Sequence, residues 1–370
     1  MTALEEVACY LPDKRVPVED VTAQLGLTSM QTRLFRRYLG LAEIRLDPGG
    51  TLLDLLSAAT GRLGGLRGRE HLVRYVLHAR VMSLVAPYPA NPLRDLCRAF
   101  GLGHAVSFTV THHACASGLL AVDVAGRLLA EDGDPRALAL VLTGEKAFTR
   151  DAQFIPGITI FGEAAAACLV SLNGPADRVL SYAVNIRGEF NGRLDRLPDV
   201  ASRYEKEYPA SFAEAMSAAA AQAGVSMGDL SLLLPTNVNM PSWQRQCRRM
   251  GFPVGRVLLD NVPVTGHAFC ADAFINYVTA VERGLLRPGD RYLIAAAGFG
   301  ATFAAMVVEH LGVPGRLPRC RRGHRRGPDI RGRAASVRRP GRVGARSGVP
   351  RLGGGHGAPL RAEPAGGGFR

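Results

Sequence analysis

The feature that most constrains this fold is the alternation of strand-like and helix-like segments along residues 1–310. Short apolar runs predict strands at 105–110, 137–143, 165–172, 178–187, 230–234, 291–297 and 302–309. Helical spacing of apolar residues predicts helices at 119–131, 209–224, 241–250 and 270–284. Such alternation is typical of an α/β fold, in which helices cover the faces of a sheet. Gly298-Phe299-Gly300 separates the last two apolar runs and predicts a hairpin turn.

The composition changes abruptly at about Gly312. Residues 311–370 hold 15 Arg and two acidic residues, whereas acidic and basic residues balance in the first 310. We therefore expect residues 312–370 to form a disordered tail rich in Arg, Gly and Pro. The tail is either an arm that attracts nucleic acid or an out-of-frame extension without a role, and we favour the second interpretation. For the body of the chain we expect no nucleic-acid partner.

Composition also limits the compartment. Apolar residues make up 47% of the chain, but no uninterrupted apolar run approaches the roughly 18 residues of a membrane span. The acidic N-terminus lacks the pattern of a signal peptide. Seven scattered Cys without a CxxC pair indicate free thiols rather than a disulfide framework or zinc site. We expect a cytoplasmic protein with no membrane association, metal or cofactor.

Cys115 is the candidate nucleophile. It follows the strand-like run 105–110 and precedes the helical pattern that starts at Leu119. A thiol in such a turn lies at a helix N-terminus, where free N–H groups and the helix dipole favour the thiolate. The thiolate is the nucleophilic form, so Cys115 suits covalent acyl chemistry. Taken alone, a Cys is more often a small buried core residue, and the rest of the chain shifts this balance toward the nucleophile.

Four blocks, in order along the chain, resemble the ketoacyl-acyl-carrier-protein synthase III group of the thiolase-like superfamily. The first is an opening strand with a YLP turn and a segment similar to RTGI. The second contains the nucleophile, the third resembles FGDGAGA, and the fourth is a set of three short motifs. In this sequence the first block is residues 8–13 with 35–41, the second is 114–118 and the third is 160–167. The fourth is residues 234–239, 266–268 and 298–300.

The resemblance implies a thiolase-like five-layered αβαβα fold of two similar halves, residues 1–173 and 174–311, and a homodimer. It also implies ping-pong chemistry, in which Cys115 takes an acyl group from a thioester on coenzyme A or an acyl carrier protein. The oxyanion hole would consist of the backbone N–H of Cys115 with that of Phe299 or Gly300.

The sequence departs from the condensing enzymes of this family at the two side chains that stabilise the enolate. Thr236 stands where those enzymes have His, and His267 stands where they have Asn. His267 is then the candidate general base, because only His titrates near neutral pH when unperturbed. Thr236, Asn237 or Asn239 would orient its ring. Asp272 is a further candidate, although it lies in an expected helix and could point away.

A second departure concerns the donor. Coenzyme A enzymes of the family often have a Trp before the RTGI-like segment, but the only Trp here is Trp243. Phe35 is a candidate to stack on adenine in its place; otherwise a carrier-protein donor is favoured. Arg36 and Arg37 are candidates to bind the acidic helix of a carrier or the phosphate of its phosphopantetheine arm, and a solvated basic face is the alternative.

These residues predict an acyltransferase of secondary metabolism, which passes an acyl group from Cys115 to an alcohol or amine acceptor. The first alternative keeps decarboxylative condensation, with His267 and Asn239 next to the enolate. The second is a non-catalytic partner subunit, which the presence of both Cys115 and His267 disfavours. A cysteine hydrolase is a remote fourth possibility.

Overall fold

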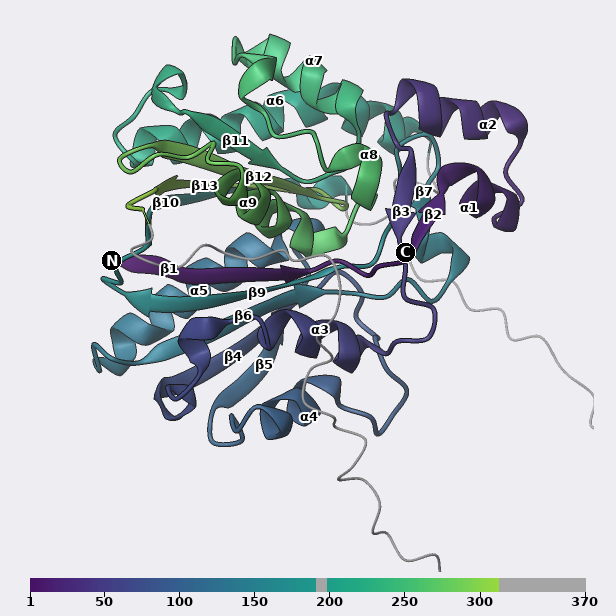
Figure 1. The fold of residues 1–370 in the computed structure, drawn as a ribbon. Coiled ribbons are helices and arrows are strands. Elements are labelled where there is room, and N and C mark those ends of the chain that lie inside the picture. The colour runs from purple at the N-terminus through teal and green to yellow at the C-terminus, as the bar shows by residue number, and fades with distance from the viewer. Residues whose placement is uncertain (191–197, 313–370) are drawn as a thin grey trace, which may run out of the picture. The chain divides into compact units, whose positions relative to one another are not determined.

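The computed structural model describes residues 1–190 and 198–312 (Figure 1). All but the first residue of the expected tail lies outside the described residues. The strands form one nine-stranded sheet in the order β11-β12-β13-β10-β1-β9-β6-β4-β5. In chain order these strands are β1 (Thr2–Tyr10), β4 (Val73–Ala79), β5 (Val106–Val110), β6 (Leu138–Gly144), β9 (Ala165–Leu172), β10 (Asp177–Ile186), β11 (Leu232–Pro235), β12 (Arg291–Gly298) and β13 (Thr302–Glu309). Two short ribbons accompany it: β2 (Arg15–Pro17) with β3 (Glu43–Arg45), and β7 (Phe154–Ile155) with β8 (Thr159–Ile160).

The nine strands divide into two half-sheets. β1 and β10 are joined only at their first residues, where Ala3 and Leu4 pair with Arg178 and Asp177. Each half-sheet contains a parallel pair, β4 with β6 in one and β11 with β12 in the other. Leu233 of β11 also forms an isolated parallel bridge with Val257. Val257 thus lies beside β11 in the second half-sheet, as β5 lies beside β4 in the first. We propose that the two halves divide at residue 173, in the turn between β9 and β10.

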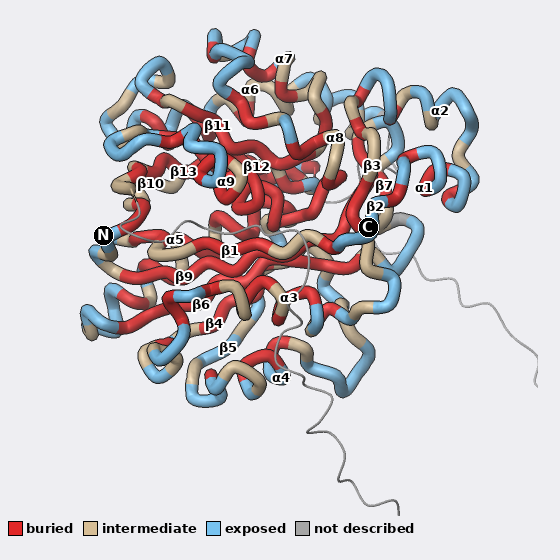
Figure 2. Tube along the Cα trace, viewed as in Figure 1, coloured by how far each residue is buried: buried red, intermediate tan, exposed pale blue. Residues whose placement is uncertain are grey.

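Helices and half-sheets alternate in five layers, each face of a half-sheet covered by apolar side chains. α3 (Leu52–Thr60) and α4 (Pro92–Ala99) cover the outer face of the first half-sheet. α5 (Ser117–Asp132) and α9 (Asp272–Glu282) fill the middle layer, and α6 (Pro198–Gln222) and α7 (Met240–Met250) cover the outer face of the second half-sheet. Figure 2 shows the buried residues concentrated in the strands and in this middle layer. The expected thiolase-like αβαβα fold is therefore confirmed.

A smaller apolar cluster holds the N-terminal helices next to the layers. α1 (Val18–Gln24), α2 (Ser29–Arg33) and the following π-helical turn at 34–38 pack with α8 (Val262–Thr265) and the two short ribbons. No helix in the described part of the chain is both long enough and apolar enough to cross a bilayer.

Most expected elements are confirmed to within two residues, and the hairpin at 298–300 is confirmed. The beginning of α6 differs. The sequence predicted a helix over 209–224, but the helix begins at Pro198 and runs through Pro209. Proline lacks the N–H that would bond to the carbonyl of Glu205, so this turn of α6 has one helical hydrogen bond fewer.

Candidate active site

Cys115 lies in a tight turn between β5 and α5, as the sequence predicts. The turn is a 3-10 segment, Ala114–Ala116, and Cys115 is 8% exposed. Two residues beside it, His112 and Ala114, have positive φ values of 72° and 45°. Residues other than glycine rarely adopt this conformation, which occurs preferentially at functional sites. The turn therefore holds the thiol in a strained position directly before the first residue of α5.

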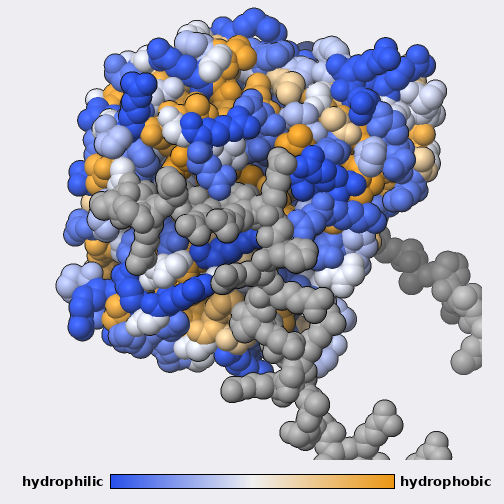
Figure 3. Space-filling view, in the orientation of Figure 1, coloured by the Kyte–Doolittle hydropathy of each residue, from blue (hydrophilic) through white to orange (hydrophobic). Residues whose placement is uncertain are grey.

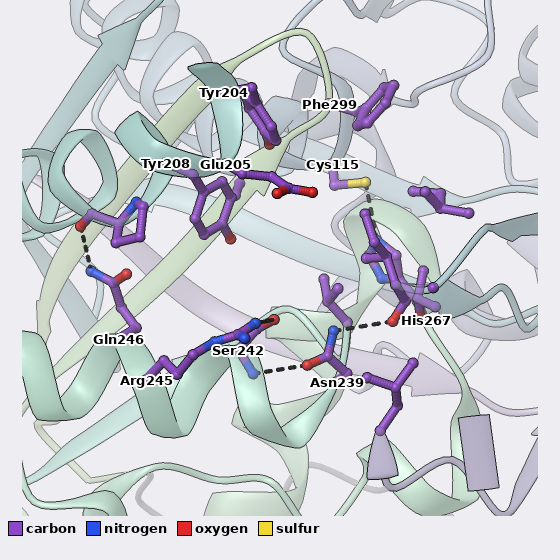
Figure 4. Close-up of a pocket in the computed structure, with 18 of the residues that line it drawn as sticks. Cys115, Tyr204, Glu205, Tyr208, Asn239, Ser242, Arg245, Gln246, His267 and Phe299 are labelled. Carbon is purple, nitrogen blue, oxygen red and sulfur yellow. Dashed lines mark hydrogen bonds between the residues drawn. The ribbon is translucent and has the colours of Figure 1, made fainter. Parts of the chain in front are cut away.

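His267 supplies the second group of the site. Its Nε2 lies 3.2 Å from the Sγ of Cys115, which is 152 residues away in the sequence (Figure 4). The backbone of His267 is fixed on both sides, because its N–H donates to Ile160 O at 3.0 Å and its carbonyl accepts from Gly162 N at 3.0 Å. The ring of Phe161 stacks on the imidazole with 4.8 Å between ring centroids.

Asp272 orients the imidazole. It is the first residue of α9, is fully buried, and its Oδ2 lies 2.5 Å from His267 Nδ1. The same carboxylate accepts hydrogen bonds from the backbone N–H groups of Asn237 at 2.6 Å and Ala268 at 2.8 Å. The structure thus decides among the orienting candidates in favour of Asp272, which the α9 start turns toward the site.

Asn237 is the residue whose role the sequence did not distinguish. Its side-chain Nδ2 lies 3.3 Å from Asp272 Oδ1. Its side-chain oxygen Oδ1 accepts a hydrogen bond from Asn276 Nδ2 at 2.9 Å. Asn276 also donates to Pro235 O and accepts from Asn261. Such a chain of satisfied buried amides holds the carboxylate rigidly. In the sequence, Thr236, Asn237 and Asn239 follow a predicted strand as a polar cluster. This pattern does not indicate which of the three contacts Asp272.

The charges of the site act together on His267. Burial lowers its pKa, but the thiolate of Cys115 and the carboxylate of Asp272 outweigh burial and raise the pKa to about 10. The imidazole is therefore protonated at neutral pH while the thiolate is present. The arrangement is a Cys–His–Asp chain, in which the imidazole contacts Cys115 Sγ through Nε2 and the Asp272 carboxylate through Nδ1.

Thr236 and Asn239 make no side-chain hydrogen bond to the imidazole. The side chain of Asn239 caps α7, accepting from Ser242 N at 2.8 Å and donating to Ile158 O at 3.0 Å. Thr236 is 1% exposed, and its Oγ1 has no hydrogen-bond partner among the described residues. The orienting role expected of these two residues is therefore not what the structure shows.

The β12–β13 turn lies directly against the nucleophile turn. A Cβ atom added to Gly298 would come within 2.1 Å of the carbonyl oxygen of His113, so only glycine fits there. Phe299 lines the same cavity as Cys115. An oxyanion hole from the N–H groups of Cys115 and Phe299 or Gly300 remains a prediction that fits this proximity.

A cavity of about 510 Å³ opens onto Cys115 and His267. One wall is apolar and comes mainly from Leu34, Leu39 and the β7–β8 ribbon. The opposite wall comes from α6 and α7. It includes Tyr204 and Tyr208, where burial is the largest cause that raises the pKa of each phenol.

Arg36 and Arg37, the expected donor residues, do not line the cavity, although Leu34 and Tyr38 of the same segment do. Arg36 pairs with Glu19 at 2.9 Å, and Arg37 is exposed on the same turn. Figure 3 shows a largely hydrophilic surface over the neighbouring α1 and α2. Phe35 is only 1% exposed and packs in the core, so the suggestion that it stacks on adenine is wrong.

Comparison with known proteins shows which proteins this chain is similar to. Residues 220–310 match the family model described as 3-oxoacyl-[acyl-carrier-protein (ACP)] synthase III C terminal. The chain is 25% identical over 331 residues to a beta-ketoacyl-[acyl-carrier-protein] synthase III of Ruegeria pomeroyi, covering 82% of this chain and 97% of that protein. The chain is therefore similar to ketoacyl-ACP synthase III proteins over most of its length.

Two further similarities agree with this assignment. A beta-ketoacyl-[acyl-carrier-protein] synthase III of Rhizorhabdus wittichii is 25% identical over 229 residues, which are 57% of this chain and 70% of that protein. The solved structure described as "ChlB3 [Aceyltransferase]" superposes with a TM-score of 0.73 at 19% identity, covering 84% of this chain and 98% of that chain. At this identity the ChlB3 structure supports the fold alone.

Proposed function

We propose that this ketoacyl-ACP synthase III-like protein is an acyltransferase of secondary metabolism that moves an acyl group from a thioester, through Cys115, to an alcohol or amine. The observation that carries the proposal is the chain Cys115–His267–Asp272, with spacings of 3.2 Å and 2.5 Å. A nucleophile, a base and an orienting carboxylate in contact are the parts that acyl transfer to a heteroatom requires.

In the first half-reaction the Cys115 thiolate attacks the carbonyl carbon of the donor thioester. A new carbon–sulfur bond forms to Cys115, and the carbon–sulfur bond to the donor breaks. The departing thiolate takes the proton of the His267 imidazolium and leaves as a thiol. Acylation removes the negative charge of Cys115, which is one of the causes that raise the pKa of His267. His267 is then neutral and able to accept a proton.

In the second half-reaction the acceptor attacks the acyl carbon. His267 Nε2 takes the proton of the attacking O–H or N–H, while Asp272 holds the proton on Nδ1 and stabilises the imidazolium that forms. The tetrahedral intermediate collapses, the Cys115 thiolate leaves, and the starting ion pair is restored. N–H groups of Cys115 and of Phe299 or Gly300 are the proposed donors to the oxyanion.

Decarboxylative condensation is the second candidate, and the names of the curated relatives favour it. It needs two polar side chains free to stabilise an enolate. Both polar ends of the Asn239 amide are already bonded, to Ser242 and Ile158, so Asn239 is not free to act with His267 on an enolate. These contacts favour simple transfer. The intact Cys–His–Asp chain also argues against a non-catalytic partner subunit.

We propose a carrier protein as the donor in preference to coenzyme A, because the buried Phe35 removes the expected adenine platform. Arg36 and Arg37 are the proposed contacts of the carrier. We also propose a homodimer in the cytoplasm. β5 lies at the end of the nine-stranded sheet, and Val106 on it is 60% exposed. An open edge of this kind pairs readily with the same edge of a second copy.

Intact-mass measurement after incubation with acyl carrier protein and acyl-CoA thioesters tests the proposal. We expect one acyl adduct on the wild type, none on Cys115→Ala, and an unchanged adduct on Cys97→Ala, which removes a buried thiol in α4. Absence of an adduct with every donor would refute an acyl-enzyme. Release of carbon dioxide from malonyl carrier protein, followed by a ketoacyl product, would replace our proposal with condensation.

A further inference from the structure

The cavity next to Cys115 carries opposite charges on two adjoining helices. Glu205 lies on α6 and Arg245 on α7, and both line the cavity together with Cys115 and His267. In Figure 4 the carboxylate of Glu205 points toward Cys115, whereas Arg245 lies farther along the same cavity, beside Ser242.

Neither charge is neutralised by its neighbours. Among residues 1–190 and 198–312, Glu205 has no hydrogen bond or ion pair, and Arg245 contacts only the hydroxyl of Ser242, at 3.5 Å. By contrast, Arg36 and Arg178, whose side chains are half-exposed, each pair with a carboxylate. Two unpaired opposite charges in one cavity of about 510 Å³ suit a small ligand that carries both complementary charges.

The surroundings of Glu205 also suit a cation. The rings of Tyr204 and Phe299 line the cavity beside it, with 6.3 Å between their centroids in an edge-on arrangement. Aromatic rings together with a carboxylate are a favourable setting for an ammonium group. Arg245 presents a planar fork of N–H donors, which matches the geometry of a carboxylate.

We propose that the acceptor is a small amine that also carries an acidic group, with its ammonium at Glu205 and its anion at Arg245. This proposal rests on the acyltransferase function above and specifies its acceptor.

The ammonium group of the acceptor must lose two protons when the amide forms. Glu205 takes one proton from the ammonium and releases it to solvent, which it can reach because its side chain is exposed. The free amine attacks the acyl carbon, and His267 takes the second proton as the carbon–nitrogen bond forms. The Cys115 thiolate leaves, and the product is an amide.

The experiment begins with enzyme already acylated on Cys115, with the loaded fraction counted by intact mass. Four three-carbon acceptors separate the charges: β-alanine, n-propylamine, 3-hydroxypropionate and 1-propanol. The rate of adduct loss and the product mass are followed for each acceptor. Since the donor has already left, any effect of Arg245 belongs to the acceptor and not to a donor phosphate.

We expect β-alanine to react fastest and 1-propanol slowest. Glu205→Gln should slow both amines by about 10- to 100-fold and spare the two hydroxyl acceptors, since each lost contact is one hydrogen bond to a charged group. Arg245→Gln should slow the two acceptors that carry a carboxylate. Glu131→Gln on exposed α5 surface and Arg249→Gln on α7 are the matched controls, because neither lines the cavity.

The outcomes separate the two proposals. If Cys115 is not acylated, the acyltransferase proposal fails and the acceptor proposal fails with it. If Cys115 is acylated but the four acceptors react equally, or Glu205→Gln slows all four alike, only the acceptor proposal is overturned.

Discussion

Replacing Asp272 by Asn tests the mechanism most directly, because it changes one oxygen of the orienting carboxylate to nitrogen. Each Asp272 oxygen lies next to donors: Oδ2 next to His267 Nδ1 and Asn237 N, and Oδ1 next to Ala268 N. An amide can turn its oxygen to only one of these sides. If its NH2 group faces His267, it donates to Nδ1 and moves the imidazole proton to Nε2. The base then presents an N–H to Cys115 and cannot accept a proton.

The expected loss can be worked out from these contacts. A hydrogen bond to a charged group contributes about 1.5–3 kcal/mol, which corresponds to about 10- to 150-fold in rate. The wrong tautomer adds to this loss, so we expect deacylation of Asp272→Asn to be at least about 100-fold slower. The amide also faces a backbone N–H with its own NH2 group, which should cost about 1–3 kcal/mol of folding stability.

The assay follows loss of the acyl adduct from pre-loaded enzyme, with urea unfolding measured in parallel. Asp260→Asn is the control, because it removes an exposed carboxylate that pairs with Arg283. A rate for Asp272→Asn within about 3-fold of wild type, in a folded protein, would refute the orienting role of Asp272.

Three further predictions follow from the geometry. Gly298→Ala should push its Cβ against His113 O, destabilise the protein by about 1–3 kcal/mol and abolish acylation. Gly188→Ala is the control, because its added Cβ would meet no atom of the described residues within 4 Å, and it should change neither stability nor acylation. His267 holds its proton more tightly in the folded protein than in the unfolded chain, so its contribution to stability is complete below pH 6.5. The free energy of unfolding should therefore fall as pH rises from 6.5 through 10, and a His267→Gln variant with the same fall would contradict this. Thr236→His should lower stability, because the larger ring must enter a site that is 1% exposed, and should release no carbon dioxide from malonyl thioesters; release would show that the imidazole restores condensation.

Apolar runs predicted β6, β9 and β13 well because both faces of these strands are buried. β9 and β13 begin and end at the predicted residues, since each run stops at polar or turn residues. The beginning of α6 was missed because a proline is compatible with both a helix start and a helix interior when tertiary packing supplies the stability.

The site was only partly accessible from the sequence. Cys115 and His267 were predicted as a pair, and the structure brings them into contact. The orienting role of Asp272 was not decided, because the direction of a side chain at the first turn of a helix depends on where the helix begins. The burial of Phe35 was likewise invisible, since an aromatic residue in a basic segment fits a surface and a core equally.

The strands β1 and β10 meet at only two residue pairs, so the two half-sheets are held together mainly by the packing of α5 and α9 in the middle layer. Cys115 lies in the turn that leads into α5, which begins at Ser117, and His267 lies in the segment before α9, which begins at Asp272. A shift of about 1 Å between α5 and α9 would break the thiol–imidazole contact while each sheet kept its own hydrogen bonds. Enzymatic activity therefore depends on the packing of α5 against α9. On gradual denaturation, activity should be lost before the circular dichroism signal of the strands.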